Sequence, residues 1–193
     1  MGRVEAVALA ILDAATRLKR LPRTGWLLAG VTQPESVAEH TVATALLALA
    51  LGGWINAAPE QHGLSLPLDL GKLAQMALVH DLAECAVTDL PHDAVALIGK
   101  ANKHRAEEQA VAALVGEFPQ PPNWAALWQE YNTGVSPEAR LARDADKLEM
   151  VHQALAYEMT GHRNLNEFWA GHGWNYAISG EVFAEMVAAR PPR

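Results

Sequence analysis

The seven-residue run at positions 78–84, Leu-Val-His-Asp-Leu-Ala-Glu, constrains this chain more than any other stretch. It places the imidazole of His80 beside the carboxylate of Asp81 at the end of an apolar helical segment. Adjacent side chains diverge by about 100° on a helix, so these two groups can serve one point only if that point lies at the edge of the element. A divalent metal ion is such a point.

Two more polar residues lie on the inward faces of predicted helices. The stripe beside His40 is formed by Val37, Thr41, Ala45 and Ala48. Asp146 stands four residues after Ala142 and borders the apolar side of its own helix. Polar groups on a buried face are unfavourable unless they are paired or bound to a cation. We therefore predict one metal site on three helices, with Asp144 as the fallback if Asp146 is exposed. The predicted ligands are His40, His80, Asp81 and Asp146.

This ordered series resembles the HD-domain metal-dependent phosphohydrolases, in which H, HD and a distant D stand on different helices of an all-α bundle. It is most similar to the 5'-deoxynucleotidases and their archaeal and eukaryotic relatives. The resemblance is carried by residues 23–26, 34–40, 80–85, 89–91, 102–108 and 145–149. It implies an all-α HD fold, a bound divalent metal and hydrolysis of a phosphoester.

Glu84 is the predicted general acid or base. It follows Asp81 by three residues, which places both on nearly the same helical face. The resemblance implies the same role for the matching glutamate. The alternative is a surface glutamate in an ion pair.

Asp89 stands where the helical pattern breaks. The resemblance matches it to a catalytic-site aspartate that approaches the sugar and selects deoxyribose over ribose. Leu90, Pro91 and His92 would then line the sugar pocket. The alternative is that Asp89 caps the helix that follows Pro91.

Arg23 and Trp26 lie in a predicted loop at residues 23–34, ahead of the His40 helix. A guanidinium is a natural bidentate partner for phosphate, and an indole offers a flat face or an N–H donor. The resemblance implies that both help to orient the phosphate, with His40 also in the substrate site. Thr24 and Gly25 separate the pair here, whereas bacterial relatives have the two residues adjacent. Trp26 keeps its spacing to His40, so its match to the family's tryptophan is more direct than the match of Arg23 to the family's arginine.

The predicted ligand set selects the kind of metal. Two imidazoles and two carboxylates suit Mn²⁺, Co²⁺, Fe²⁺, Ni²⁺ or Zn²⁺ better than Ca²⁺. One such ion would polarise the P–O bond and activate water, so no serine or cysteine nucleophile is required. The single cysteine, Cys85, is expected to be a buried filler. One cysteine permits no internal disulfide and is typical of a reducing cytoplasm.

The composition is that of a globular chain with one core. Its 193 residues are 50% hydrophobic and 19% charged. We predict one domain at 1–193, with a core at about 4–160 and a C-terminal extension at 161–193. The net charge of -7 provides no general attraction for nucleic acid. Residues 1–19 lack the features of a signal peptide, and no lipid anchor is expected. The longest apolar run, residues 43–53, is shorter than the ~20 residues of a membrane helix, so we expect a buried core helix and no membrane partner.

Apolar spacings of three and four predict helices, and no alternating run is long enough to predict a strand. The predicted helices span residues 4–19, 37–51, 68–83, 94–116, 124–131, 137–160 and 179–189. Ser36 and Glu39 form a capping box, which assigns Glu39 a structural task. Ser136 is expected to cap the helix that begins at Pro137.

Several segments are expected to interrupt these helices. Gly52 and Gly53 should end the helix at 37–51, residues 56–67 should form a surface excursion, and residues 119–122 a rigid connector. Residues 190–193 are expected to fray. The charges of the helix at 94–116 are expected to form mostly a solvated face. They are Lys100, Lys103, Arg105, Glu107 and Glu108.

These observations predict a cytoplasmic hydrolase that converts deoxyribonucleoside 5'-monophosphates to deoxynucleoside and phosphate. One alternative is hydrolysis of another phosphoester, such as a nucleoside triphosphate, a cyclic nucleotide or an alarmone. The other is a nucleotide-binding module without turnover. The expected partners are a small nucleotide and a second copy of the chain, because HD relatives resemble dimers and the Trp-rich C-terminal third offers apolar surface.

Overall fold

The computed structural model describes residues 3–115 and 123–192. Within these ranges the chain forms helices and no strand, with one isolated antiparallel bridge between Pro22 and Ser36. The prediction of an all-α fold is confirmed. The chain divides into two compact units, the first formed by Met1–Thr41 and Leu78–Gln129 and the second by Val42–Ala77 and Glu130–Arg193. The single domain predicted from the sequence stays a prediction.

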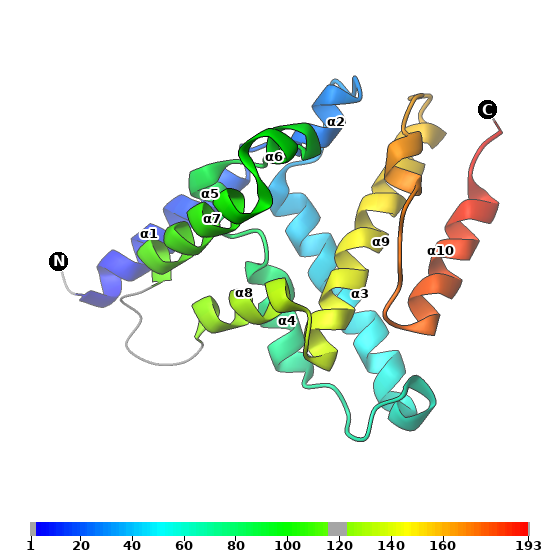
Figure 1. Cartoon of the computed structure of the whole chain (residues 1–193), viewed down its shortest axis with the longest axis horizontal. Helices are drawn as coiled ribbons and strands as arrows, with labels where there is room; N and C mark the ends of the chain where they lie inside the picture. Colours follow the sequence, from blue (N-terminus) through cyan, green and yellow to red (C-terminus); the bar gives the residue numbers. More distant parts are fainter. Residues whose placement is uncertain (1–2, 116–122, 193) are drawn as a thin grey trace. The chain divides into compact units, whose positions relative to one another are not determined.

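The first unit contains the segments on which most of the predicted site residues lie. Its complete helices are α1 (Arg3–Leu18), α2 (Thr24–Leu28), α5 (Glu84–Val87), α6 (His92–Ile98) and α7 (Lys100–Val115). It also includes the first turn of α3 (Val37–Ala57), the end of α4 (Leu70–Val79) and the start of α8 (Trp124–Thr133). The short helix α5 packs against both α1 and α7, as Figure 1 shows.

The core of the first unit lies directly behind the predicted metal-binding run. Leu82 and Ala83, which follow the His-Asp pair, are buried in one cluster with Val111 and Trp128. Cys85 packs at the edge of this cluster, and burial raises the pKa of its thiol. The packing of Leu82 and Ala83 in this apolar cluster therefore holds the run in place. Cys85 fills space at the edge of the cluster, as predicted.

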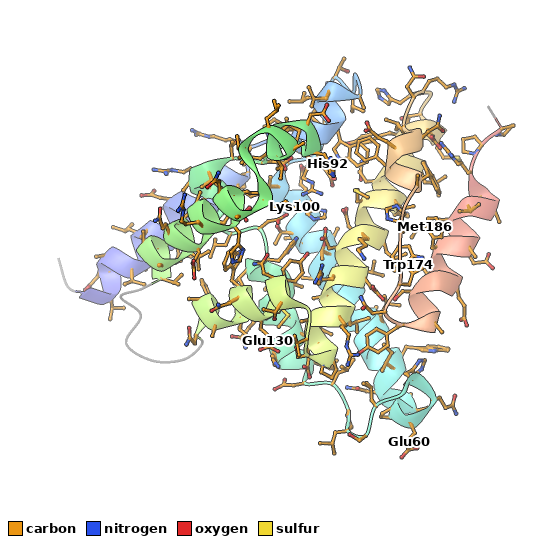
Figure 2. The ribbon with its side chains drawn as sticks, viewed as in Figure 1. Glu60, His92, Lys100, Glu130, Trp174 and Met186 are labelled. Carbon is orange, nitrogen blue, oxygen red and sulfur yellow. The ribbon has the colours of Figure 1, made fainter. Side chains whose placement is uncertain are left out.

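The second unit is built around α9 (Pro137–Met159), which packs against α10 (Ala177–Ala189) and η2 (Asn166–Trp169) (Figure 1). It also contains the rest of α3 and α4, the end of α8 and η1 (Pro59–His62). Ser136 caps α9 as predicted, because its Oγ accepts a hydrogen bond from the backbone N–H of Ala139 at 3.1 Å. Figure 2 shows Trp174 beside α10, where its ring centroid lies 5.3 Å from that of Phe183.

The prediction that Gly52 and Gly53 end a helix is wrong, because α3 continues through both to Ala57. A Cβ built on Gly52 would lie 2.8 Å from the Cδ2 atoms of both Leu70 and Leu73 on α4. Gly52 is therefore a point of close approach between two helices. The glycine pair permits packing at this place and does not break the helix.

Three other element predictions need correction. The predicted helix at 94–116 is two helices, α6 and α7, separated at Gly99, whose φ is +85°. The predicted loop at 23–34 contains the short helix α2. Arg190 does not fray, because its Nε and NH2 donate to the Glu158 carboxylate at 2.7 and 2.5 Å. The predicted connector at 119–122 lies outside the described residues.

The helix α3 is long and apolar enough to cross a membrane by length and composition, a test that core helices of soluble proteins also pass. Its two faces differ in the structure. Ala48 and Ile55 are fully buried, whereas Val42, Leu46 and Trp54 are exposed. The expectation of a buried core helix therefore describes one face of α3 only.

Candidate metal centre and active site

The predicted metal-binding run lies in a tight turn between two helices. Helix α4 ends at Val79, and α5 begins at Glu84. The backbone N–H of Leu82 donates to Val79 at 3.1 Å, and that of Glu84 donates to Asp81 at 3.0 Å. Side chains three residues apart eclipse each other in such 3₁₀ turns. Asp81 and Glu84 are therefore directed to one side of the chain, as predicted, but by a tighter turn than an α-helix.

Three donor atoms converge at this turn. The Nε2 atoms of His40 and His80 lie 3.4 Å apart. The Oδ2 atom of Asp81 lies 3.2 Å from Nε2 of His80 and 3.7 Å from Nε2 of His40. Both imidazoles are buried, and their rings meet edge to face. The structure thus brings together three of the four predicted ligands.

The separations of these atoms fit a common cation. Metal–nitrogen and metal–oxygen bonds of roughly 2.1 Å place neighbouring ligand atoms about 3 Å apart. The three observed separations of 3.2 to 3.7 Å approach this spacing. Imidazole nitrogen and carboxylate oxygen together suit first-row divalent metals. The three atoms are therefore spaced so that they could bind one ion.

Asp81 is held as a carboxylate, the form that binds metal. Burial opposes its ionisation, but His80, Arg23 and His40 together place its pKa well below the ordinary value. Arg23 contributes a direct ion pair, in which NH1 lies 3.2 Å from Oδ2 of Asp81. The arginine of the predicted phosphate-binding loop therefore lies at the carboxylate of Asp81, a predicted metal ligand.

Glu84 differs from Asp81 in its protonation. Its side chain is 6% exposed, and burial, then Asp81 and Asp89, raise its pKa to about 10. Its Oε2 atom is buried and has no hydrogen-bond partner among the described residues. The alternative of a surface glutamate in an ion pair is wrong. Glu84 carries a proton at neutral pH, which is the state that a general acid requires.

Asp89 anchors the loop that carries Arg23. Its Oδ2 accepts a hydrogen bond from the backbone N–H of Thr24 at 2.6 Å, and the Thr24 hydroxyl donates to the Asp89 carbonyl at 2.8 Å. Asp89 does not cap α6, because Pro91 is the capping residue there and no side chain bonds the helix end. Thr88 just before it has φ 68°, a conformation that β-branched residues rarely adopt. This turn directs Asp89 toward α2.

The remaining predicted substrate residues have varied environments. Trp26 is 1% exposed, and its indole N–H donates to Oε1 of Glu35 at 2.9 Å. This hydrogen bond fastens α2 to the segment before α3. Leu90 and Pro91 are half-buried, and His92 is exposed at the start of α6, where Figure 2 labels it. Contact of these four side chains with a nucleotide stays a prediction.

The second unit contains the fourth predicted ligand, Asp146, half-buried on α9. The hydroxyl of Tyr131 donates to Oδ2 of Asp146 at 2.6 Å, which orients the carboxylate. Asp144 is committed elsewhere, because its oxygens accept the backbone N–H groups of Asn175 and Tyr176. The fallback ligand is therefore a structural residue. Metal binding by Asp146 stays a prediction.

Two charged residues of α7 were placed wrongly by the prediction of a solvated face. Glu107 is 8% exposed, and Lys103 is half-buried with its Nζ bonded to Oε1 of Glu107. The signal was present in the spacing, since Lys103 and Glu107 continue the buried stripe of Val111 and Val115 backwards in steps of four. Because both residues are charged, the sequence-based prediction placed them on the exposed face despite this spacing.

An all-helical fold with a cluster of histidine and aspartate at one turn, next to a protonated glutamate, is typical of metal-dependent hydrolases. The family model described as HD domain matches residues 15–171. The chain belongs to this family.

Named relatives agree with the family. The chain is 39% identical over 145 residues to the zebrafish protein named 5'-deoxynucleotidase HDDC2, covering 74% of this chain and 65% of that relative. It is 34% identical to the human protein of the same name, covering 94% of this chain and 85% of that protein. The chain thus spans just under two thirds of the zebrafish relative. The predicted relationship to the 5'-deoxynucleotidases is confirmed.

Solved structures agree as well. The crystal structure of PH0347 protein from Pyrococcus horikoshii superposes with a TM-score of 0.78 at 35% identity, covering 94% of this chain and 99% of that one. A conserved hypothetical protein from Pyrococcus furiosus superposes with a TM-score of 0.75 at 34% identity. Both likenesses extend over nearly the whole chain.

Proposed function

We propose that this chain is a metal-dependent phosphomonoesterase that hydrolyses deoxyribonucleoside 5'-monophosphates to deoxynucleoside and phosphate. The observation that carries the proposal is the convergence of His40, His80 and Asp81 beside Arg23, with protonated Glu84 three residues on. The names of the curated relatives support the deoxynucleotide substrate.

The chain's own residues would hold one divalent ion, such as Mn²⁺, Co²⁺, Fe²⁺, Ni²⁺ or Zn²⁺. His40, His80 and Asp81 supply three ligands, and Asp146 supplies the fourth from α9. When bound, such an ion polarises a phosphate oxygen and lowers the pKa of water. The hydrogen bond from Tyr131 holds Asp146 in one orientation, as outer-shell partners of metal ligands do.

Arg23 and Glu84 perform the remaining chemistry. Arg23 presents a permanent cation beside Asp81, and a guanidinium pairs with phosphate oxygens in a bidentate manner. Water attacks phosphorus, and the bond between phosphorus and the 5'-oxygen breaks. Glu84 gives its proton to the departing 5'-oxygen, which leaves as the nucleoside hydroxyl, and the proton that the attacking water gives up returns to the Glu84 carboxylate.

Asp89 is the proposed source of deoxyribose selectivity. A carboxylate near C2' disfavours a 2'-hydroxyl and accepts a hydrogen bond from the 3'-hydroxyl. Thr24 holds this carboxylate through its backbone N–H, so the position of Asp89 is defined before substrate arrives. Leu90, Pro91 and His92 would complete the sugar pocket.

Phosphate release from a panel of nucleotides tests the proposal. Protein treated with chelator and reloaded with Mn²⁺ or Co²⁺ should hydrolyse deoxynucleoside monophosphates faster than ribonucleotides, triphosphates or cyclic nucleotides. His80→Gln should abolish metal binding and turnover, whereas His152→Gln, an exposed position on α9, should change neither. Silence on every monophosphate would reject the function, and retained nucleotide binding without turnover would favour a binding module.

We also propose that the chain forms a homodimer in the cytoplasm. The lone Cys85 supports that compartment. On the C-terminal third Trp169 is buried, whereas Met159 and Val187 are exposed. An alternative surface is the face of α3 that carries Val42 and Leu46, 54% and 65% exposed. Light scattering should report a dimer that Leu46→Glu dissociates, while Leu97→Glu, at an 89% exposed leucine of α6, leaves it intact.

A further inference from the structure

A cavity of about 140 Å³ lies at the C-terminal end of α9, within the second unit. Its lining comes from the last turn of α9 with the chain that follows it, and from the three residues after α10 (Figure 1). Glu158 in this lining stands more than three turns after Asp146, about 18 Å further along the same helix. Pockets for drug-sized ligands measure roughly 300–1,000 Å³. The cavity is therefore separate from the candidate metal ligand and suits one small group.

The turn after α9 is fixed by its backbone. The N–H of Gly161 donates to the carbonyl of Glu158 at 3.1 Å, and the N–H of His162 donates to that of Tyr157 at 3.0 Å. Gly161 has φ +101°, so the helix ends in a Schellman motif. Backbone groups thus occupy these carbonyls of the last turn. The side chain of Arg163, which is exposed in the cavity lining, is not needed to cap the helix.

Arg190 is held firmly in the lining. Its Nε and Nη2 donate to the Glu158 carboxylate, and Nη2 also donates to Oδ1 of Asn166 at 2.8 Å. Its guanidinium lies 4.5 Å from the centroid of the Trp169 ring. A guanidinium has five N–H donors, and these hydrogen bonds use three of them. The two on Nη1 have no hydrogen-bond partner within residues 3–115 and 123–192.

The lining offers many donors and few acceptors. Asn166 uses its Oδ1 on Arg190, which leaves the N–H groups of its Nδ2. Arg163 adds a second guanidinium, which bonds to no other side chain of the described residues. The one acidic side chain of the lining, Glu158, is occupied by Arg190. A ligand that carries negative charge and only accepts hydrogen bonds is complementary to such a lining.

We propose that this cavity binds one oxyanion group of the phosphate class, with Arg190 as the fixed cation and Arg163 and Asn166 as further donors. Arginine pairs with phosphate through parallel N–H bonds, and the rigid anchoring of Arg190 reduces the entropy lost on binding. The chain carries a net charge of -7, so affinity for an anion here is a local property of the lining. The inference is independent of the proposed function, because it requires neither a metal nor turnover.

Calorimetric titration with inorganic phosphate at low ionic strength tests the site. The full chain is treated with chelator first, so that phosphate bound to a metal contributes no heat. Arg163→Gln should weaken phosphate binding about threefold to tenfold. Asn166→Asp keeps the acceptor for Arg190 but replaces the donor by a negative charge, and should weaken binding about 10-fold or more. Both side chains are exposed, so Tm should change little; Arg140→Gln, at an exposed position earlier on α9, is the matched control and should bind as wild type.

Three results would overturn the proposal: no phosphate binding by wild type, equal affinity in wild type and both lining variants, or an equal loss in Arg140→Gln. The same titration with a deoxynucleoside 5'-monophosphate identifies the source of the group. Sensitivity to the same two substitutions assigns the site to the phosphate of a nucleotide, whereas sensitivity of inorganic phosphate alone assigns it to free phosphate. If Mn²⁺-loaded wild type releases no phosphate from any nucleotide but binds phosphate in this way, the proposed function fails and the anion site stands.

Discussion

Glu84 is the position at which activity and stability should oppose each other. Its carboxyl group has a pKa of about 10 in the folded chain against an ordinary 4.5, with burial as the main cause. The folded state therefore holds this proton more tightly than the unfolded chain does. The free energy of unfolding must fall as pH rises from 4.5 toward 10, because the unfolded state gains by releasing the proton. Glu84→Gln removes the titrating group, and with it this loss of stability at high pH, and keeps the shape of the side chain.

The size of the effect follows from the pH interval. From its ordinary pKa of 4.5 up to pH 8, an interval of 3.5 pH units, the unfolded chain has released the Glu84 proton whereas the folded chain retains it. Over this interval the unfolded state therefore gains free energy relative to the folded state. At about 1.4 kcal/mol per unit this would amount to ~5 kcal/mol. Local relaxation and entry of water reduce such penalties, so we expect Glu84→Gln to raise the free energy of unfolding by about 2 kcal/mol at pH 8. Near pH 4.5 the two proteins should be equally stable.

Urea unfolding at pH 5, 6.5 and 8 measures this difference. The protein is treated with chelator, because a bound ion would stabilise the folded state by its own linkage. Glu108→Gln is the matched control: this glutamate is exposed on α7, and its substitution should give no pH-dependent difference. After the same protein is reloaded with Mn²⁺, turnover of Glu84→Gln should fall by roughly 10²–10⁴-fold relative to wild type. A stability difference that is the same at pH 5 and pH 8, or that shrinks toward pH 8, would refute the reasoning.

Three further changes have clear expected outcomes. Gly52→Ala should lower the free energy of unfolding by about 1–3 kcal/mol because its Cβ meets α4, whereas Gly53→Ala, which meets nothing within 4 Å, should be neutral or stabilising in the same urea titration. Tyr131→Phe removes the hydrogen bond to Asp146 and should weaken Mn²⁺ binding about 10-fold by calorimetry; unchanged affinity would argue against Asp146 as a ligand. Arg190→Met removes the two bonds to the glutamate of α9 and should lower the free energy of unfolding by about 1–3 kcal/mol, with faster proteolysis after α10 as the local check.

Signals that act within one helical turn were predictable from the sequence. The capping box is the clearest example, because the N–H and hydroxyl of Ser36 both donate to Oε2 of Glu39, at 2.6 and 2.8 Å. These bonds also lower the pKa of Glu39, which confirms its structural task. The cap of α9 by Ser136 was predictable for the same reason. In each case both partners lie within four residues, so the pattern contains the whole interaction.

Glycines show where local patterns fail. Gly52 and Gly99 look alike in the sequence, yet α3 continues through the first and the helix stops at the second. The difference lies in their neighbours: Gly52 faces the side chains of Leu70 and Leu73, whereas Gly99 adopts φ +85° in open surroundings. Leu70 and Leu73, which are 18 and 21 positions further along the chain, decide the first case, and no window of a few residues contains that information.

The candidate site was predictable to the extent that its chemistry is unusual. A His-Asp pair alone is a weak signal, but together with His40 on another helix it predicted a shared site, and the structure brings these three side chains together. The burial of Lys103 and Glu107 was not predicted, because charged residues on a helix are most often solvated. The spacing of four residues from Val111 was a signal, but the charge outweighed it, and the structure shows Glu107 buried and Lys103 half-buried.

The proposed sugar selectivity of Asp89 and the proposed phosphate binding of Arg23 depend on one contact, the hydrogen bond between Asp89 and Thr24. Asp89 holds the N–H of Thr24, and Thr24 directly follows the arginine that pairs with Asp81. The unusual φ of Thr88 is needed to bring Asp89 to this place, and strain of this kind persists where the surroundings over-determine it. Under the proposed function, the carboxylate that discriminates the sugar also positions the cation that receives the phosphate. Because both would then depend on one hydrogen-bonded anchor, a change at Asp89 should alter the selection against ribose and the affinity for phosphate together.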